Sequence, residues 1–365
     1  MSKFTLNQLN GVKPYLPASQ EIWSLPAEVA SLKLDWNESS REPSPLVRQA
    51  LVDFVQSDRL RYYPNVRNEA LLEELACYTN CPPNTLNYFS GSDALHECII
   101  RAFVEKGDTV CIFGPTYDNF RLISEVSGAN IRRLDYNTMF EYDASCVTLS
   151  GAKLAYICNP NNPTGEFVSP QILLKLFDHN PGTLFVVDEA YVEFCPELSV
   201  SGYVKQYDNV IICRTLSKAF GLASIRFGYS ISHPSLNDVL ALVRNTKSVS
   251  MFAQVSAIAA LRDEQYMSEY VKEVEVVRQK TIKLLTSTMG GQLKIFNGKG
   301  NFLLIEFTDI EAKDNLVNVL SRNKVYVRSF DRSSPFHHCI RLSLMSLESF
   351  KHFQAVLEEE LALLK

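Results

Sequence analysis

Long hydrophobic runs are missing from the sequence: none approaches the roughly 20 apolar residues that span a bilayer. The apolar core of a secretion signal is missing from the opening stretch, which reads MSKFTLNQLNGVKPYLP. A basic excess is missing too, because the formal net charge is −5, which argues against a general nucleic-acid binder. We therefore expect a cytoplasmic protein that has neither a membrane nor nucleic acid among its partners.

Metal-ligand patterns are scarce as well. The nine cysteines are scattered and odd in number, so we expect free thiols in a reducing compartment. Cys77 and Cys81 form one close pair, but no second pair follows at ligand spacing. We therefore expect no metal site and interpret the pair as two small residues on one helix face.

The length and the pattern of apolar runs indicate an α/β protein of more than one domain. With 365 residues, the chain is too long for one compact core and suits two unequal domains. Short apolar runs alternate with segments of helical length, which predicts a mostly parallel sheet. The expected strands are Val110–Phe113, Leu154–Cys158, Leu184–Val187 and Val210–Cys213. The expected helices between them include Asp93–Glu105 and Pro170–Asp178.

The C-terminal third changes to α+β patterning. We expect a long amphipathic helix over Tyr266–Thr288, strands at Asn301–Phe307 and Lys324–Arg328, and a final helix over about Ser346–Leu364. We therefore predict three parts: an N-terminal arm (residues 1–35) that packs on the small domain, a large domain (36–245) and a small α+β domain (246–365).

Polar sequence follows each of the four expected parallel strands. These segments are Gly114–Tyr117, Asn159–Gly165, Asp188–Tyr191 and Arg214–Gly221. In an α/β sheet, ligands bind at the carboxyl ends of the strands. Four such segments in this order predict a single crevice that binds a ligand.

A resemblance to the fold-type-I pyridoxal-phosphate (PLP) aminotransferases is carried by the segments RTLSKAFGLASIRFGY, NPNNPTG and DEAY. The histidinol-phosphate aminotransferase branch is resembled most, through GVKPYLPASQEIW, LKLDWNESSREPSP and RYYP. The resemblance runs from about residue 11 to the C-terminus. It implies an aspartate-aminotransferase-like α/β fold, pyridoxal 5′-phosphate as cofactor, and a homodimer with shared active sites.

Three catalytic residues follow from the resemblance and from the chemistry of the cofactor. Lys218 is expected to bond to the cofactor aldehyde, because a primary amine condenses with it. Asp188 ends an apolar run, where an unpaired charge is costly, and is expected to face the pyridine nitrogen and keep it protonated. Tyr191 and Asn162 are expected to reach the phenolic oxygen of the cofactor and stabilise its phenolate.

The cofactor phosphate requires hydrogen-bond donors and a positive charge. Helix N-termini bind phosphate through backbone amides, and an arginine adds a bidentate, permanently charged partner. The residues expected at this phosphate are Ser92, Asp93, Thr215, Ser217 and Arg226.

The resemblance also assigns residues around the cofactor ring and the substrate. Tyr117 is expected to stack on the ring, and Tyr63 to reach the phosphate in the other subunit. The residues expected to bind the substrate or line the entrance are Arg341, Arg328, Tyr15, Asn37 and Glu38.

Several segments depart from the pattern of that branch, and they cluster near the substrate: Ala94, Ser39–Pro43, Thr246–Val249 and Leu342–Met345. We therefore expect an aminotransferase that moves an amino group between glutamate/2-oxoglutarate and a phosphorylated small amine, with histidinol phosphate as first candidate. Another amino-alcohol phosphate or an aromatic amino acid is the alternative substrate. A decarboxylase of an amino-acid phosphate, and a binding protein that has lost catalysis, are the alternative functions.

Overall fold

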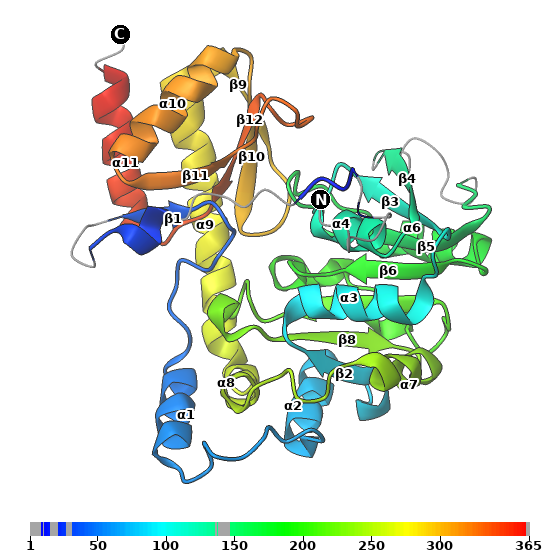
Figure 1. The fold of residues 1–365 in the computed structure, drawn as a ribbon. Coiled ribbons are helices and arrows are strands. Elements are labelled where there is room, and N and C mark those ends of the chain that lie inside the picture. The colour runs from blue at the N-terminus through cyan, green and yellow to red at the C-terminus, as the bar shows by residue number, and fades with distance from the viewer. Residues whose placement is uncertain are drawn as a thin grey trace.

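Two β-sheets organise the protein. The computed structural model describes residues 9, 11–14, 21–26, 31–135, 137 and 147–362. In this part of the chain the strands form one sheet of seven and one sheet of five, which lie in separate halves of the molecule (Figure 1).

The larger sheet has the order β2-β8-β7-β6-β5-β3-β4. Its strands are β2 (Leu86–Phe89), β3 (Thr109–Gly114), β4 (Asn130–Asp135), β5 (Ala152–Cys158), β6 (Leu184–Asp188), β7 (Val210–Thr215) and β8 (Gly228–Ser232). Strand β8 pairs antiparallel with β2 and β7, and the remaining pairs are parallel. The four strands expected from the sequence are confirmed as β3, β5, β6 and β7.

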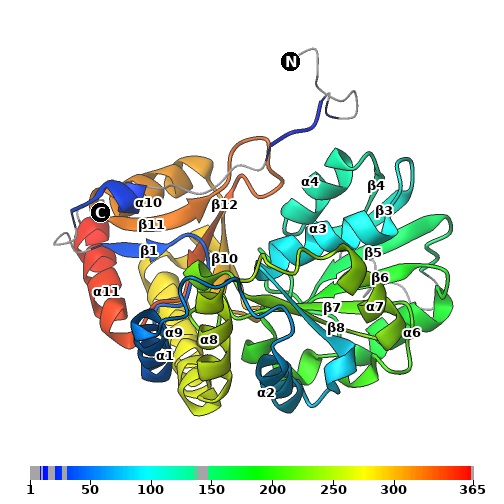
Figure 2. The ribbon, with the colours of Figure 1, turned by 60° about the horizontal axis from the view of Figure 1, so that its bottom comes forward.

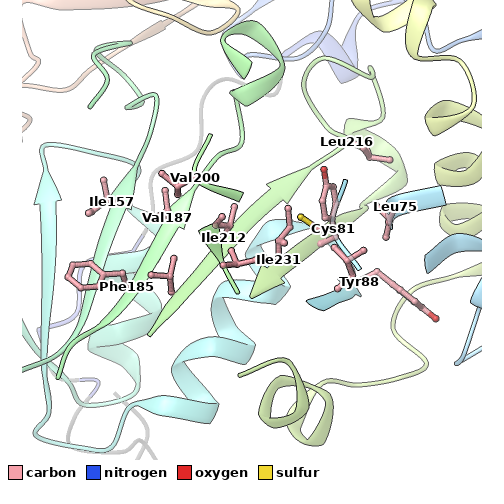
Figure 3. Close-up of a cluster of buried hydrophobic side chains, with 14 of the residues drawn as sticks. Leu75, Cys81, Tyr88, Ile157, Phe185, Val187, Val200, Ile212, Leu216 and Ile231 are labelled. Carbon is pink, nitrogen blue, oxygen red and sulfur yellow. The ribbon is translucent and has the colours of Figure 1, made fainter. Parts of the chain in front are cut away.

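Helices cover both faces of the larger sheet, which is why its central strands are continuously apolar. One face packs on α3 (Gly91–Phe103), α4 (Asn119–Val126) and α7 (Pro234–Val243). The other face packs on α2 (Glu69–Thr79), α6 (Pro170–His179) and α8 (Met251–Leu261). Figure 3 shows part of this second core, to which Leu75 of α2 and Ile212 and Ile231 of the sheet belong.

The smaller sheet has the order β1-β11-β12-β10-β9. Its strands are β1 (Leu32–Leu34), β9 (Leu293–Phe296), β10 (Phe302–Phe307), β11 (Val325–Ser329) and β12 (Cys339–Ser343), and its helices are α9 (Glu264–Met289), α10 (Ile310–Arg322) and α11 (Leu347–Ala362). Helix α9 reaches from α8 to this sheet (Figures 1 and 2). The C-terminal helices and strands expected from the sequence are confirmed as α9, β10, β11 and α11.

The chain passes between the two halves more than once. Strand β1 pairs parallel with β11, so residues 32–34 belong to the smaller sheet. Helix α1 (Pro45–Gln56) then packs on α8, whose alanines lie in the core of the larger half (Figure 2). The division into an arm, a large domain and a small domain at the stated boundaries stays a prediction.

Among the helices of the described residues, none combines the length and the apolar character of a membrane-spanning segment.

The expectation that Cys77 and Cys81 share one helix face is wrong. Helix α2 ends at Thr79, and Asn80 follows in the left-handed conformation with a φ of 53°. A short polar side chain tolerates that conformation, which ends the helix. Cys77 is exposed and Cys81 is buried beyond the helix end, with its thiol 3.7 Å from the carbonyl oxygen of Ser201.

Candidate active site

The carboxyl ends of the parallel strands meet at one edge of the larger sheet. Cys158, Asp188 and Cys213 lie side by side there as register partners on β5, β6 and β7. The loop after β5 contacts the loop after β3, since Asn161 Nδ2 donates to the carbonyl of Pro115 at 3.0 Å. The structure therefore brings together the polar segments that follow the central strands, as the sequence predicts.

Asp188 is the buried carboxylate of this edge, with 3% of its surface exposed. Tyr156 Oη donates to Asp188 Oδ2 at 2.7 Å, and the backbone amide of Ala190 donates to Oδ1 at 3.1 Å. His96 Nε2 lies 3.4 Å from Oδ2. Burial and the carboxylate raise the pKa of Tyr156 well above its ordinary value, so this phenol stays a hydrogen-bond donor.

Tyr191 is held by two amide side chains. Its hydroxyl oxygen accepts from Asn37 Nδ2 at 2.9 Å and from Asn162 Nδ2 at 3.2 Å. A hydroxyl has two acceptor sites and one proton, so the proton of Tyr191 points away from both amides. Burial raises the pKa of Tyr191 well above its ordinary value, which keeps that proton available for donation.

Lys218 follows β7 and is partly buried beside these groups. Its Nζ donates to the carbonyl of Trp36 at 2.9 Å and lies 5.7 Å from the centre of the Tyr191 ring. Burial and the nearby Arg341 guanidinium lower the pKa of Lys218 to about 8. A much larger share of the amine is therefore neutral near physiological pH than in an ordinary lysine.

Two glycines shape the N-terminus of α3. Gly91 has a φ of +85°, and a Cβ atom there would lie 2.5 Å from Arg226 Nη2. A Cβ atom on Gly228 would lie 2.6 Å from the amide nitrogen of Ser92. Arg226 Nη2 also lies 3.3 Å from Asp93 Oδ2. Because these glycines have no side chains, the Arg226 guanidinium and strand β8 can lie close to the first backbone amides of α3. The amides at a helix N-terminus bind anions well.

Hydroxyl groups extend this end of the site. Thr215 Oγ1 lies 2.8 Å from Ser217 Oγ, and the Ser217 amide donates to Thr215 Oγ1 at 3.1 Å. Tyr117 Oη donates to Asp93 Oδ1 at 3.1 Å, which fixes the ring of Tyr117 beside the start of α3. The structure therefore places all the residues expected at the phosphate, together with Tyr117, in one region.

Arg341 links the smaller sheet to the loop after β5. Its Nη1 donates to Asn162 Oδ1 at 2.7 Å, and its Nη2 donates to the carbonyl of Asp35 at 2.6 Å. Arg328 on β11 is the register partner of Arg341 on β12. Directly opposed residues of antiparallel strands project to the same face, so the two side chains are neighbours. We call Arg328 and Arg341 the arginine pair.

The segment after β1 closes the site from the side of the smaller sheet. Asn37 is fully buried with a φ of 55°, and its backbone amide donates to Ser343 Oγ at 2.9 Å. Its carbonyl accepts from Asn301 Nδ2 at 3.1 Å. Glu38 is paired with Lys33, whose Nζ lies 2.6 Å from Glu38 Oε2. Asn37 is therefore fixed by hydrogen bonds to Ser343, Asn301 and Tyr191, which allows it to orient the Tyr191 hydroxyl.

One residue expected at the site, Tyr63, is not brought to it in this single chain. Tyr63 is 79% exposed, and Lys247 Nζ lies 4.6 Å from the centre of its ring. Its predicted role belongs to a second subunit and stays a prediction. Tyr15 lies outside the described residues.

Two neighbours of Asp188 are additional to the residues expected from the sequence. Tyr156 lies two residues before Cys158 on β5, so alternation along the strand places both on the face that bears Asp188. His96 follows Asp93 by three residues on α3, which places it on the same side of that helix. These two periodicities are the signal in the sequence that could have identified them.

The family description "Aminotransferase class I and II" matches residues 30–357. The chain belongs to this family, which consists of pyridoxal-phosphate enzymes of fold type I. It is therefore an aminotransferase.

Individual relatives and structures agree with this assignment. A dihydroxyacetone phosphate transaminase of Campylobacter jejuni is 41% identical over 325 residues, which cover 87% of each chain. A histidinol-phosphate aminotransferase of Thermoanaerobacter pseudethanolicus is 32% identical over 346 residues, or 94% of each chain. The crystal structure of histidinol-phosphate aminotransferase from Sinorhizobium meliloti in complex with pyridoxal 5′-phosphate matches with a TM-score of 0.80 at 26% identity, covering 92% of each chain. The expected aspartate-aminotransferase-like α/β fold is confirmed.

Proposed function

We propose that this aminotransferase moves an amino group between glutamate/2-oxoglutarate and a small phosphorylated amine or ketone. The residues of the site fit pyridoxal phosphate, independently of the comparisons with relatives. A buried carboxylate suits a ring pyridinium, and a half-buried lysine with a lowered pKa suits the aldehyde. The start of α3, where the glycines leave room for Arg226, suits the phosphate. When bound, the cofactor supplies an electron sink for the substrate carbon.

Each residue around the ring has a defined task in this proposal. Lys218 would hold the cofactor aldehyde through its neutral amine and would act as general acid and base for the substrate proton. Asp188 keeps the ring nitrogen protonated. Tyr191 donates its one proton, and Asn162 its amide, to the phenolic oxygen. Tyr117 stacks on the ring.

Phosphate binding is assigned to the region at the start of α3. The groups proposed to hold it are the amides of Ser92 and Asp93, the hydroxyls of Thr215 and Ser217, and the guanidinium of Arg226. The short distance between Arg226 and Asp93 supports this assignment, because the pair already aims the guanidinium at the helix end. An anion there would receive backbone donors and a permanent charge together.

The observation that carries the substrate class is the arginine pair. The two guanidinium groups stand at opposed positions of neighbouring strands, so they can bind one anion together. Arg341 also donates a hydrogen bond to Asn162, so the arginine pair lies next to the proposed cofactor site. A phosphate offers up to three charged acceptor oxygens and uses two guanidinium groups better than a carboxylate does.

Within that class, the first candidate is a three-carbon keto phosphate. The Campylobacter jejuni relative, which is named for dihydroxyacetone phosphate, shares 41% identity, against 32% for the Thermoanaerobacter pseudethanolicus histidinol-phosphate aminotransferase. Dihydroxyacetone phosphate accepts an amino group to give serinol phosphate, an amino-alcohol phosphate. Histidinol phosphate is the second candidate, because relatives that act on it match 94% of the chain.

The working unit in this proposal is a cytoplasmic homodimer in which Tyr63 of each chain reaches the phosphate of the other. The exposed apolar side chains of the α1 region support a covered surface there, since Val52, Val55, Leu60 and Tyr62 are each at least 47% exposed.

The test is the half-reaction with glutamate. The cofactor-loaded protein should release about one equivalent of 2-oxoglutarate per site and then convert dihydroxyacetone phosphate to serinol phosphate. Release of carbon dioxide without 2-oxoglutarate would identify a decarboxylase instead. Absence of both products would contradict the proposed reaction class.

A further inference from the structure

A buried histidine lies beneath the carboxylate of Asp188. His96 is fully buried on α3, and its Nε2 lies 3.4 Å from Asp188 Oδ2. Its ring packs edge-on against Phe120 at 5.2 Å and Tyr156 at 5.6 Å between ring centres. Phe120 and Tyr156 are themselves stacked at 4.2 Å. The imidazole is thus clamped by aromatic rings with one edge directed at the carboxylate.

This position is costly for an imidazole that serves only as packing. Within the described part of the chain, neither ring nitrogen of His96 has a hydrogen-bond partner of good geometry. A buried polar group without a partner loses its hydration and is destabilising. The surroundings on this face of the sheet are apolar, including Leu95, Ile99 and Phe120. A phenylalanine would fill the same space without that cost, so the nitrogen facing Asp188 calls for an explanation.

We propose that His96 is a positioning residue that, together with Tyr156, keeps Asp188 ionised and directed at the ring nitrogen of the cofactor. The inference rests on the proposed cofactor site. Tyr156 Oη donates to Oδ2 and the Ala190 amide donates to Oδ1, while His96 Nε2 lies 3.4 Å from Oδ2, within reach for its N–H to become a second donor to that oxygen when the cofactor is bound. A carboxylate oxygen has two lone-pair directions, so Oδ1 retains one for the cofactor.

The consequence concerns the proton between Asp188 and the ring nitrogen. Donors on Oδ2 stabilise the charged carboxylate. The shared proton therefore stays on the ring nitrogen and does not move to Asp188. Because a protonated ring is the better electron sink, His96 supports catalysis without touching the cofactor or the substrate.

The experiment compares His96→Phe and His96→Gln in the cofactor-loaded enzyme. Phenylalanine retains the aromatic packing and removes the donor, whereas the glutamine amide places an N–H near the position of Nε2. The readout is the ¹⁵N NMR shift of pyridoxal phosphate labelled at the ring nitrogen. We expect a pyridinium signal in the wild type, a shift toward neutral pyridine in His96→Phe, and recovery in His96→Gln.

A second readout is the dissociation constant for pyridoxal phosphate. His96→Phe should weaken binding by roughly ten- to a hundredfold, the range for losing one hydrogen bond to a buried charge. The matched control is Ile99→Val, a core change on the same helix. It should lower the melting temperature and leave the ring-nitrogen signal unchanged.

The outcomes separate this inference from the proposed function. If the wild type does not capture pyridoxal phosphate on Lys218, the cofactor site is wrong and the role of His96 falls with it. If the wild type captures the cofactor and His96→Phe keeps the full pyridinium signal, the role of His96 is wrong and the cofactor site stands. If Ile99→Val shifts the signal as His96→Phe does, the effect is one of packing, which also overturns the inference. Should His96→Phe not fold, His96→Leu and Tyr156→Phe test the same donors.

Discussion

Removal of Arg328 from the arginine pair should affect the two half-reactions differently. A carboxylate has two oxygens, and one guanidinium group can donate a hydrogen bond to each of them. A phosphate has more charged oxygens and can accept from both guanidinium groups of the arginine pair. Arg341 is already fixed by Asn162 and the Asp35 carbonyl, so it serves both substrates. We therefore expect Arg328→Gln to harm the phosphorylated substrate selectively.

The magnitude follows from the type of contact. One hydrogen-bonded charge contact contributes about 1.5–3 kcal/mol, so kcat/KM for the phosphorylated substrate should fall roughly 10- to 150-fold. The glutamate half-reaction should stay within about fivefold, the effect of a solvent-exposed ion pair. Arg328→Lys should recover only part of the loss, because lysine keeps the charge and loses the planar fork.

The assay is single-turnover kinetics of each half-reaction, followed by the absorbance of the cofactor. The matched control is Arg322→Gln, which removes an exposed arginine at the end of α10 in the same half of the molecule. It should leave both half-reactions unchanged. Equal losses for glutamate and for the phosphorylated substrate in Arg328→Gln would refute the two-fork explanation.

Three further predictions test the cofactor residues. The pKa of Lys218 is lowered to about 8, so its amine is protonated below that pH and neutral above it. Covalent capture of pyridoxal phosphate by the cofactor-free protein should therefore speed up with pH and level off above about 8; a rise that continues to pH 10 would indicate an ordinary lysine. Asp188→Ala should fold and lose most of its turnover, and a rate within about tenfold of wild type would contradict its role, since ring protonation is worth more than that. Mixed Lys218→Ala and Tyr63→Ala proteins should regain activity in hybrid dimers, and no recovery despite subunit exchange would exclude a shared site.

Strands with a continuous apolar pattern could be predicted from the sequence, whereas strands that carry polar or charged residues could not. Strands β5, β6 and β7 are buried on both faces and read as apolar runs. Strand β8 reads GYSIS, where Ser230 and Ser232 are fully buried although polar. Strand β4 carries Arg132 and Arg133 at the sheet edge, so it shows no apolar run either. Their strand character depends on pairing partners that local composition does not reveal.

The candidate site divides in a similar way. Its loops follow strand ends and carry contiguous motifs, so Asp188, Tyr191 and Lys218 could be predicted as site residues from the sequence. The contacts beneath and beside them depend on tertiary geometry. The Trp36 carbonyl that accepts from Lys218 is a backbone group, which any residue type supplies. His96 contacts Asp188 only because α3 crosses the sheet at that register.

The central claim is that the enzyme transfers an amino group to and from a short phosphorylated substrate. The most direct measurement is kcat/KM for serinol phosphate, histidinol phosphate and histidinol, each with 2-oxoglutarate as acceptor. The arginine pair predicts that histidinol is at least roughly tenfold worse than its phosphate, since histidinol lacks a charged contact. The proposal of a three-carbon substrate predicts that serinol phosphate is the best of the three. A higher value for histidinol phosphate would identify the second candidate as the substrate. Equal values for histidinol and histidinol phosphate would contradict the role of the arginine pair and with it the proposed substrate class.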